Sequence, residues 1–207
     1  MGNAEVVDQS ARVQLCGMFV VELSGRRIDQ LLPGRQGRLL FAYLTISRLQ
    51  PVSRDTVIDA LWGDSPPADA SGALNALISK TRTVVGPDVL RGRTYLTLAL
   101  PEPARVDVEM ALSQLHSAES AIALGAWRRA WAPALSALFV ARRTFLPEAE
   151  AWWAEAWRRR LADVRLRALE SYAEVCLGLK GAELPGAQRA ARELIEAAPF
   201  RESGHLL

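Results

Sequence analysis

The 207-residue sequence has little of the chemistry that builds metal sites or disulfide frameworks, with only two cysteines and two histidines. Cys16 and Cys176 lie far apart and have no Cys or His neighbour at ligand spacing. This excludes a disulfide framework and a zinc site, and it is typical of buried thiols in a reducing compartment. No metal or other cofactor is predicted.

Long hydrophobic runs are also missing. Apolar runs such as ALFVA at 137–141 are far too short to cross a bilayer, and residues 1–12, MGNAEVVDQSAR, lack the apolar core of a signal peptide. We therefore expect a cytoplasmic protein with no membrane partner.

Catalytic constellations are equally scarce. His116 and His205 have no triad or metal partner at any recognisable spacing. The segment GRQGR at 34–38 lacks the Gly-Lys-Ser/Thr ending with which a phosphate loop holds a nucleotide. The sequence thus predicts no catalytic residue, and a protein that is not an enzyme.

An excess of charge is absent too, since 25 Lys and Arg face 23 Asp and Glu for a net charge of +2. Bulk charge therefore favours neither nucleic acid nor membrane surfaces, and any basic site must be local. What the sequence does have is 50% hydrophobic residues and six tryptophans, which is the balance of a folded chain long enough for two small domains.

The first half alternates strand and helix patterns. Residues 12–29 indicate short strands with tight turns, and residues 34–51 indicate a first helix. In VSRDTVIDALWGDSPP at 52–67, Ser53 caps a second helix that Gly63 ends, and the two prolines precede a third helix over about 68–85. Residues 89–100 then predict a β-hairpin.

The second half is predicted to be entirely helical. A change of composition at LPEPARVD, residues 100–107, marks the expected boundary between a domain at 12–100 and a domain at 105–207. Paired helices joined by short connections favour a tetratricopeptide-like stack. The predicted helices cover about 107–124, 126–141, 148–180 and 184–198. The expected fold class is mainly α with a small β component.

The third predicted helix carries the candidate site. Its inward side holds Leu74, Leu77, Ile78, Thr81 and Val85, whereas its outward side is unusually slim. A helix that enters the major groove needs such a slim face, with long donors at its edges for phosphates and base edges. On this basis Asn75 could pair with adenine, and the other candidates could contact guanine, phosphate or a thymine methyl. The small outward residues are Gly72, Ala76, Ser79 and Thr83, and the flanking ones are Asn75, Lys80 and Arg82.

Positive charge gathers beside this helix. Between residues 79 and 93 there are four cations and the single acid Asp88, and Arg91 and Arg93 flank Gly92 at the predicted hairpin tip. A polar helix face with a few cations is most often ordinary solvated surface. Its combination with a helix-turn-helix and a charged hairpin favours a winged helix bound to duplex DNA, with Arg91 and Arg93 at the adjacent backbone or minor groove.

These segments resemble the Streptomyces antibiotic regulatory protein (SARP) family of transcriptional activators. The resemblance covers nearly the whole chain, and it rests on GRLLFAYLTI, VSRDTVIDALWGDSPPADASGALNALISKTRTVVG, VDVEMALSQLHSAESAIALGAW and APFRESGHLL. It implies an OmpR-like winged helix joined to a bacterial transcriptional activation domain. It also implies binding to promoter repeats, recruitment of RNA polymerase and control of antibiotic biosynthesis. The family's Arg-rich SRLRR segment is matched by residues 79–83, where Thr81 and Thr83 depart from it.

Two further expectations accompany this interpretation. The last segment, RESGHLL at 201–207, resembles the opening of a helix whose partner is absent, so the end of the chain is expected to expose apolar surface that a second copy covers as a homodimer. The alternative function is a protein-interaction adaptor that binds a peptide or small-molecule effector through its helical half. The outward face of residues 68–85 distinguishes the two functions, because a helix that docks on a protein would tolerate large apolar residues there.

Overall fold

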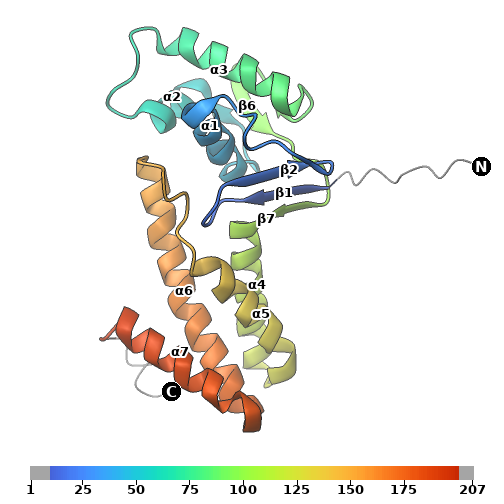
Figure 1. Cartoon of the computed structure of the whole chain (residues 1–207), viewed down its shortest axis with the longest axis vertical. Helices are drawn as coiled ribbons and strands as arrows, with labels where there is room; N and C mark the ends of the chain where they lie inside the picture. The colour runs from blue at the N-terminus through green and yellow to red at the C-terminus, as the bar shows by residue number, and fades with distance from the viewer. Residues whose placement is uncertain (1–9, 201–207) are drawn as a thin grey trace, which may run out of the picture. The chain divides into compact units, whose positions relative to one another are not determined.

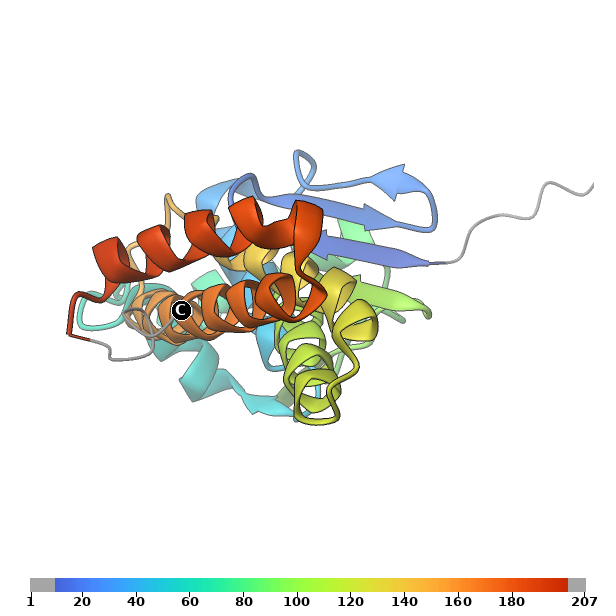
Figure 2. The ribbon, with the colours of Figure 1, turned by 90° about the horizontal axis from the view of Figure 1, so that it is seen from below.

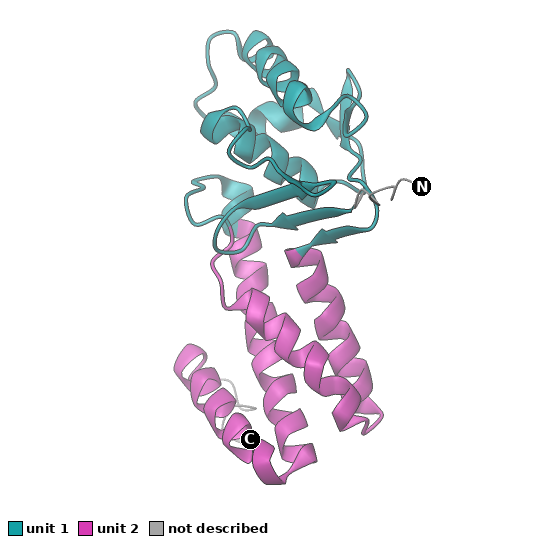
Figure 3. Ribbon diagram, turned by 45° about the vertical axis from the view of Figure 1, so that its right-hand side comes forward, with its two compact units in different colours: residues 1–106, 146–155 teal, residues 107–145, 156–207 magenta. Residues whose placement is uncertain are grey.

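The computed structural model describes residues 10–200, which form two compact units (Figure 3). Unit 1 contains residues 1–106 and 146–155, and unit 2 contains residues 107–145 and 156–207. The chain is mainly helical with a small β component, which confirms the predicted fold class. Residues 104–106 and 146–155 group with unit 1, although the domain ranges expected from sequence end the first domain at 100.

A four-stranded sheet opens unit 1. Its strands are β1 (Ala11–Gln14), β2 (Val20–Leu23), β3 (Arg26–Arg27) and β7 (Ala104–Val106), in the order β3-β2-β1-β7. β1 pairs antiparallel with β2 and parallel with β7. The alternation read from residues 12–29 therefore does mark strands, and their buried side chains face the core of unit 1.

Unit 1 also contains three helices. They are α1 (Gly34–Ile46), α2 (Arg54–Trp62) and α3 (Ala70–Val85). Figure 1 shows α1 and α2 between α3 and the strands β1 and β2. All three predicted helices are present. Only one side of α3 is buried, so its other long face lies away from the core.

Side-chain caps set the ends of α2 and α3. The Ser53 hydroxyl accepts from the Thr56 amide at 3.1 Å, as predicted, and Gly63 ends α2 at a φ of 51° that favours glycine. α3 begins at Ala70 rather than Ala68, because the Asp69 carboxylate accepts from the Gly72 amide at 2.8 Å and so becomes the cap.

The predicted hairpin is also present. β5 (Leu90–Arg91) and β6 (Tyr95–Leu98) pair antiparallel, and β6 also pairs with β4 (Val52–Ser53), just before α2. Gly92 turns the chain at a φ of 92°, where a Cβ atom would overlap the carbonyl oxygen of Tyr95. The turn therefore requires glycine, and it holds the hairpin tip next to α3.

Residues 146–155 complete the core of unit 1. The Leu146 amide donates to the Leu15 carbonyl at 2.8 Å, and the Trp153 side chain is only 2% exposed. The Trp153 ring lies 5.2 Å from the Tyr43 ring, centroid to centroid, and its N–H donates to the Ala60 carbonyl at 2.9 Å. Trp153 is therefore part of the core of unit 1.

Unit 2 is built from α4 (Asp107–Ala123), α5 (Trp127–Ala141), most of α6 (Trp152–Leu179) and α7 (Leu184–Ala197). A short 3-10 turn, η1 (Gly181–Glu183), precedes α7. Figure 2 shows α7 alongside α6. All four predicted helices are present, and the largest difference is the start of α6 at 152 rather than 148.

The later start of α6 has a local cause. Leu146 takes a positive φ of 37°, and the Ala149 amide donates to its carbonyl at 2.9 Å. These contacts fold residues 146–149 into a turn against unit 1, so helical hydrogen bonding starts only beyond them. Within residues 10–200, no helix is both long and apolar enough to cross a membrane.

Candidate nucleic-acid interface

The two faces of α3 differ sharply. Leu74, Ile78, Thr81 and Val85 are buried against unit 1, and Leu77 is half-buried. The exposed residues of the opposite face are Asn75, Ala76, Ser79, Lys80 and Thr83. None of the large apolar side chains that are exposed belongs to α3, all of whose residues are described. The helix thus presents a slim polar face, as its sequence predicts.

Gly72 has a role that the sequence pattern did not reveal. It is only half-exposed, and a Cβ atom at this position would overlap the carboxylate of Asp69 that caps α3. The residue is small because the cap lies over it.

Arg82 is tied to the hairpin. This half-buried side chain donates from Nε to the Leu90 carbonyl at 2.9 Å and from Nη2 to the Gly92 carbonyl. Sequence reasoning expected this guanidinium to reach guanine or phosphate. In the structure two of its donor positions hold the hairpin against α3, and its positive charge stays at the edge of the polar face.

Arg54, the first residue of α2, is a site residue that sequence reasoning missed. Its Nη2 donates to Asn75 Oδ1 at 2.6 Å, and its Nη1 donates to the Arg93 carbonyl at 3.2 Å. One side chain thereby joins α2, α3 and the hairpin. The sequence signal that could have pointed to Arg54 is a long donor directly after the Ser53 cap. It stands at the start of the helix that precedes the predicted recognition helix.

These contacts surround a notch between α3 and the hairpin. Its volume is about 530 Å³, and it is lined by Arg54, Asn75, Ile78, Ser79, Arg82, Thr83 and Arg93. Five of the seven predicted site residues therefore share one concave surface with Arg54. Lys80 is exposed on the next position of α3 and lines a different hollow, with Trp62 and Ala76.

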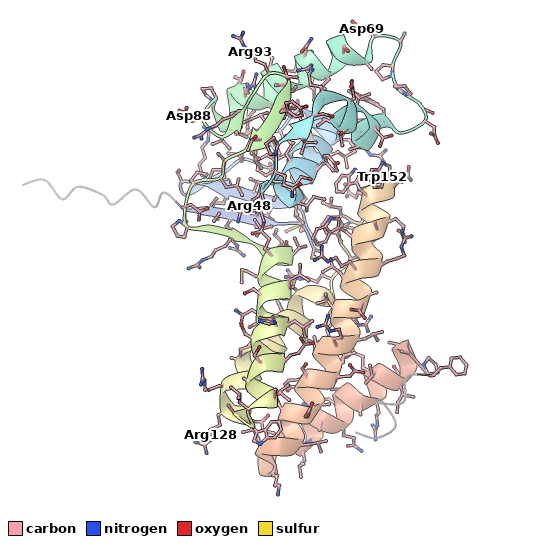
Figure 4. The ribbon with its side chains drawn as sticks, turned by 180° about the vertical axis from the view of Figure 1, so that it is seen from behind. Arg48, Asp69, Asp88, Arg93, Arg128 and Trp152 are labelled. Carbon is pink, nitrogen blue, oxygen red and sulfur yellow. The ribbon has the colours of Figure 1, made fainter. Side chains whose placement is uncertain are left out.

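Two of the predicted cations, Arg91 and Arg93, belong to the hairpin segment. Arg91 is exposed, and its Nε donates to the Asp88 carbonyl at 2.6 Å. Figure 4 shows Arg93 projecting from the hairpin beside α3. Its backbone is held by Arg54 while its side chain remains exposed.

The charges of this region are not neutralised internally. Throughout the described segment 70–100, no Lys or Arg forms an ion pair with a carboxylate. The guanidinium groups of Arg54, Arg82 and Arg91 are instead bonded to neutral oxygen atoms. Their positive charge therefore remains available to a polyanion.

The other candidate groups do not come together. His116 is exposed on α4, whereas His205 lies outside the described residues, as does the segment 201–207. In the part of the chain that the structure describes, no cluster of three His, Cys, Asp or Glu side chains is placed to hold a metal ion.

A capped helix pair, a slim outward face on the second helix and a basic hairpin beside it define a winged-helix protein, here followed by an all-helical unit. The solved structure of Mycobacterium tuberculosis EmbR in complex with a low affinity phosphopeptide has the same fold. It superposes with a TM-score of 0.81 at 21% identity, over 94% of this chain and 52% of that one.

Sequence comparisons lead to the same group of proteins. The transcriptional regulatory protein EmbR of M. tuberculosis is 28% identical over 101 residues, which cover 49% of this chain and 26% of EmbR. The regulatory protein AfsR of Streptomyces coelicolor is 31% identical over 138 residues, which cover 66% of this chain and 14% of AfsR. No protein-family model matches the chain. The chain is homologous to EmbR and AfsR, both SARP-family regulators, which supports the resemblance to that family, and it spans only a part of either of them.

Proposed function

We propose that the chain is a sequence-specific, double-stranded DNA-binding transcriptional activator. α3 enters the major groove with its slim face, where Asn75 and Ser79 reach base edges, while Lys80, Thr83 and Arg82 stand at the phosphates. Arg91 and Arg93 grip the neighbouring backbone from the hairpin. The observation that carries this proposal is the exposed polar face of α3 beside a notch whose cations have no carboxylate partner.

The homologous regulators support the wider role. Their names describe transcriptional regulation, and the family resemblance implies promoter repeats, head-to-tail protomers and genes of secondary metabolism. In this proposal unit 1 holds the protein on a promoter in the cytoplasm, and unit 2 contacts RNA polymerase or a second copy of the chain. The mechanism is binding rather than catalysis.

The first test measures phosphate contacts. Duplexes enriched by the wild-type protein from a randomised library are titrated at several salt concentrations with Lys80→Ala, Arg93→Ala and the control Arg128→Ala. Arg128 is an equally exposed cation of unit 2. Each of the first two variants should weaken binding to every duplex and flatten the plot of log affinity against log salt by about one unit. The proposal fails if these variants bind like the control.

The second test measures base reading. Asn75→Ala removes a group proposed to touch a base edge, so it should reduce discrimination at one base pair by about 1 to 3 kcal/mol. Affinity for the other positions should change little. A uniform loss over all sequences would instead place Asn75 at the backbone, and unaltered binding would favour the adaptor function, in which α3 does not meet DNA.

A further inference from the structure

We propose that Arg54 is a positioning residue that determines which base Asn75 reads. This inference rests on the proposed function, and it adds a second residue, on a different helix, to the recognition of one base pair. Its starting point is the contact of 2.6 Å between Arg54 Nη2 and Asn75 Oδ1.

The chemistry of the pair fixes the orientation of the Asn75 amide. A guanidinium group has only donors, so the Asn75 atom that faces it must be the carbonyl oxygen and not the amide nitrogen. Arg54 is always charged, and a bond from a charged donor is stronger than a neutral one. The NH₂ group of Asn75 is therefore directed away from Arg54.

Arg54 is itself held in place. Its second nitrogen, Nη1, donates to the Arg93 carbonyl at 3.2 Å, and its backbone begins the helix that Ser53 caps. The side chain is half-buried, whereas Asn75 is exposed on α3. Moving Arg54 away from Asn75 would also break its link to the hairpin, so the amide is oriented before any ligand arrives.

This orientation changes the base preference expected of an asparagine. An unconstrained Asn side chain binds adenine through two bonds, accepting from N6 with its oxygen and donating to N7. The Oδ1 atom keeps a second lone pair, but it is turned toward Arg54, so Asn75 presents its NH₂ donors foremost. Guanine offers two acceptors in the major groove, N7 and O6, whereas adenine offers one. We therefore expect Asn75 to read guanine, in place of the adenine expected from its residue type.

The experiment compares base preferences selected from a randomised duplex library. Wild-type protein should show one position at which guanine is preferred. Arg54→Met keeps a flexible, unbranched stem but removes the donors, which frees Oδ1. This variant should change the preference at that same position from guanine to adenine, with a change of about tenfold in their ratio. Preferences at the other positions should stay the same.

A second variant keeps the inference testable if Arg54→Met unfolds, which its thermal melting curve would reveal. Asn75→Asp retains an acceptor for Arg54 but removes the donors, and carboxylates accept from the N4 amino group of cytosine. The guanine preference at that position should therefore be replaced by a cytosine preference, in a protein whose Arg54 is intact.

The outcomes separate the two proposals. If the wild-type protein enriches no duplex, the DNA-binding function itself is overturned. If the wild type enriches duplexes but both variants keep its base preferences and only lose affinity, DNA binding stands and the positioning role of Arg54 is overturned. In that case Arg54 would act as a phosphate contact only. A change at one base pair supports the inference, because lost phosphate contacts weaken all sequences alike.

Discussion

Arginines are used differently in two regions of the molecule. In unit 2 several of them pair with carboxylates: Arg167 donates to both oxygens of Glu119, at 2.7 and 2.8 Å from Nη2, and Arg142 and Arg165 share Glu193. Around α3 and the hairpin they bond to neutral oxygens, as Arg82 does with the Leu90 carbonyl.

The two arrangements differ in whether the charge of the guanidinium group is neutralised. A hydrogen bond to a neutral oxygen holds a guanidinium group in place without cancelling its charge, whereas a carboxylate does both. The first arrangement suits a surface that meets a polyanion, and the second suits contacts between helices of the same chain. A net charge of +2 for the whole chain is thus compatible with a strongly basic site.

The largest predicted effect comes from placing a carboxylate among the cations of the notch. Ser79→Glu adds an acid to the face of α3 beside Arg54 and Arg82, so the region would come to resemble unit 2. Repulsion from phosphates and neutralisation of the guanidinium groups should reduce duplex affinity by about 100-fold. Ser79→Gln, of similar size but uncharged, is the control in the same titration. Equal losses for both variants would mean that size alone matters here.

A smaller effect is expected when a bond to neutral oxygens is removed. Arg82→Met loses the donors that hold the Leu90 and Gly92 carbonyls, at a cost of about 2 kcal/mol to the local stability of the hairpin. Hydrogen exchange at the amides of β6 should accelerate by about 30-fold. Lys80→Met, an exposed change on the same helix, should leave these rates unaltered. Unchanged exchange in Arg82→Met would show that the strand pairing alone holds the hairpin.

The smallest effect is expected from an ion pair in unit 2. Burial raises the pKa of Glu193, but the hydrogen bonds from Arg142 and Arg165 outweigh it, and the pKa lies below its ordinary value of 4.5. Because these side chains are partly exposed, Glu193→Gln should cost only about 1 kcal/mol of unfolding free energy at neutral pH.

The pH dependence of this cost follows from the direction of the pKa shift. A carboxyl group with a lowered folded pKa stabilises the protein above its unfolded pKa, and this stabilisation is lost as the pH falls through the folded value. The difference in unfolding free energy between wild type and Glu193→Gln should therefore be full above pH 4.5 and vanish in stronger acid. The control is Glu196→Gln, an exposed change on α7. A difference that persists in acid would assign the cost to packing.

Much of the fold could be predicted because its signals are local. The Ser53 cap, the Gly63 stop and the apolar side of α3 each depend on neighbours within a few residues. The start of α6 was predicted wrongly, because a contact between Leu146 and Leu15, distant in sequence, decides it. Periodicity carries no information about such pairs.

The same limit applies to the candidate site. The exposed face of α3 follows from helical periodicity, and its residues were found without the structure. Arg54 was not found, because its partners Asn75 and Arg93 meet it only through the packing of α2, α3 and the hairpin. The attachment of Arg82 to the hairpin was missed for the same reason.

The parallel pairing of β7 with β1 decides how unit 1 can be studied in isolation. A fragment that stopped at residue 100, the boundary that composition suggests, would remove β7 and leave the backbone groups of β1 unpaired along one edge. It would also lose the indole that fills the space beside Tyr43. Open strand edges recruit other chains, so such a fragment should precipitate. A soluble fragment of unit 1 has to retain residues 104–106 and a linked copy of 146–155.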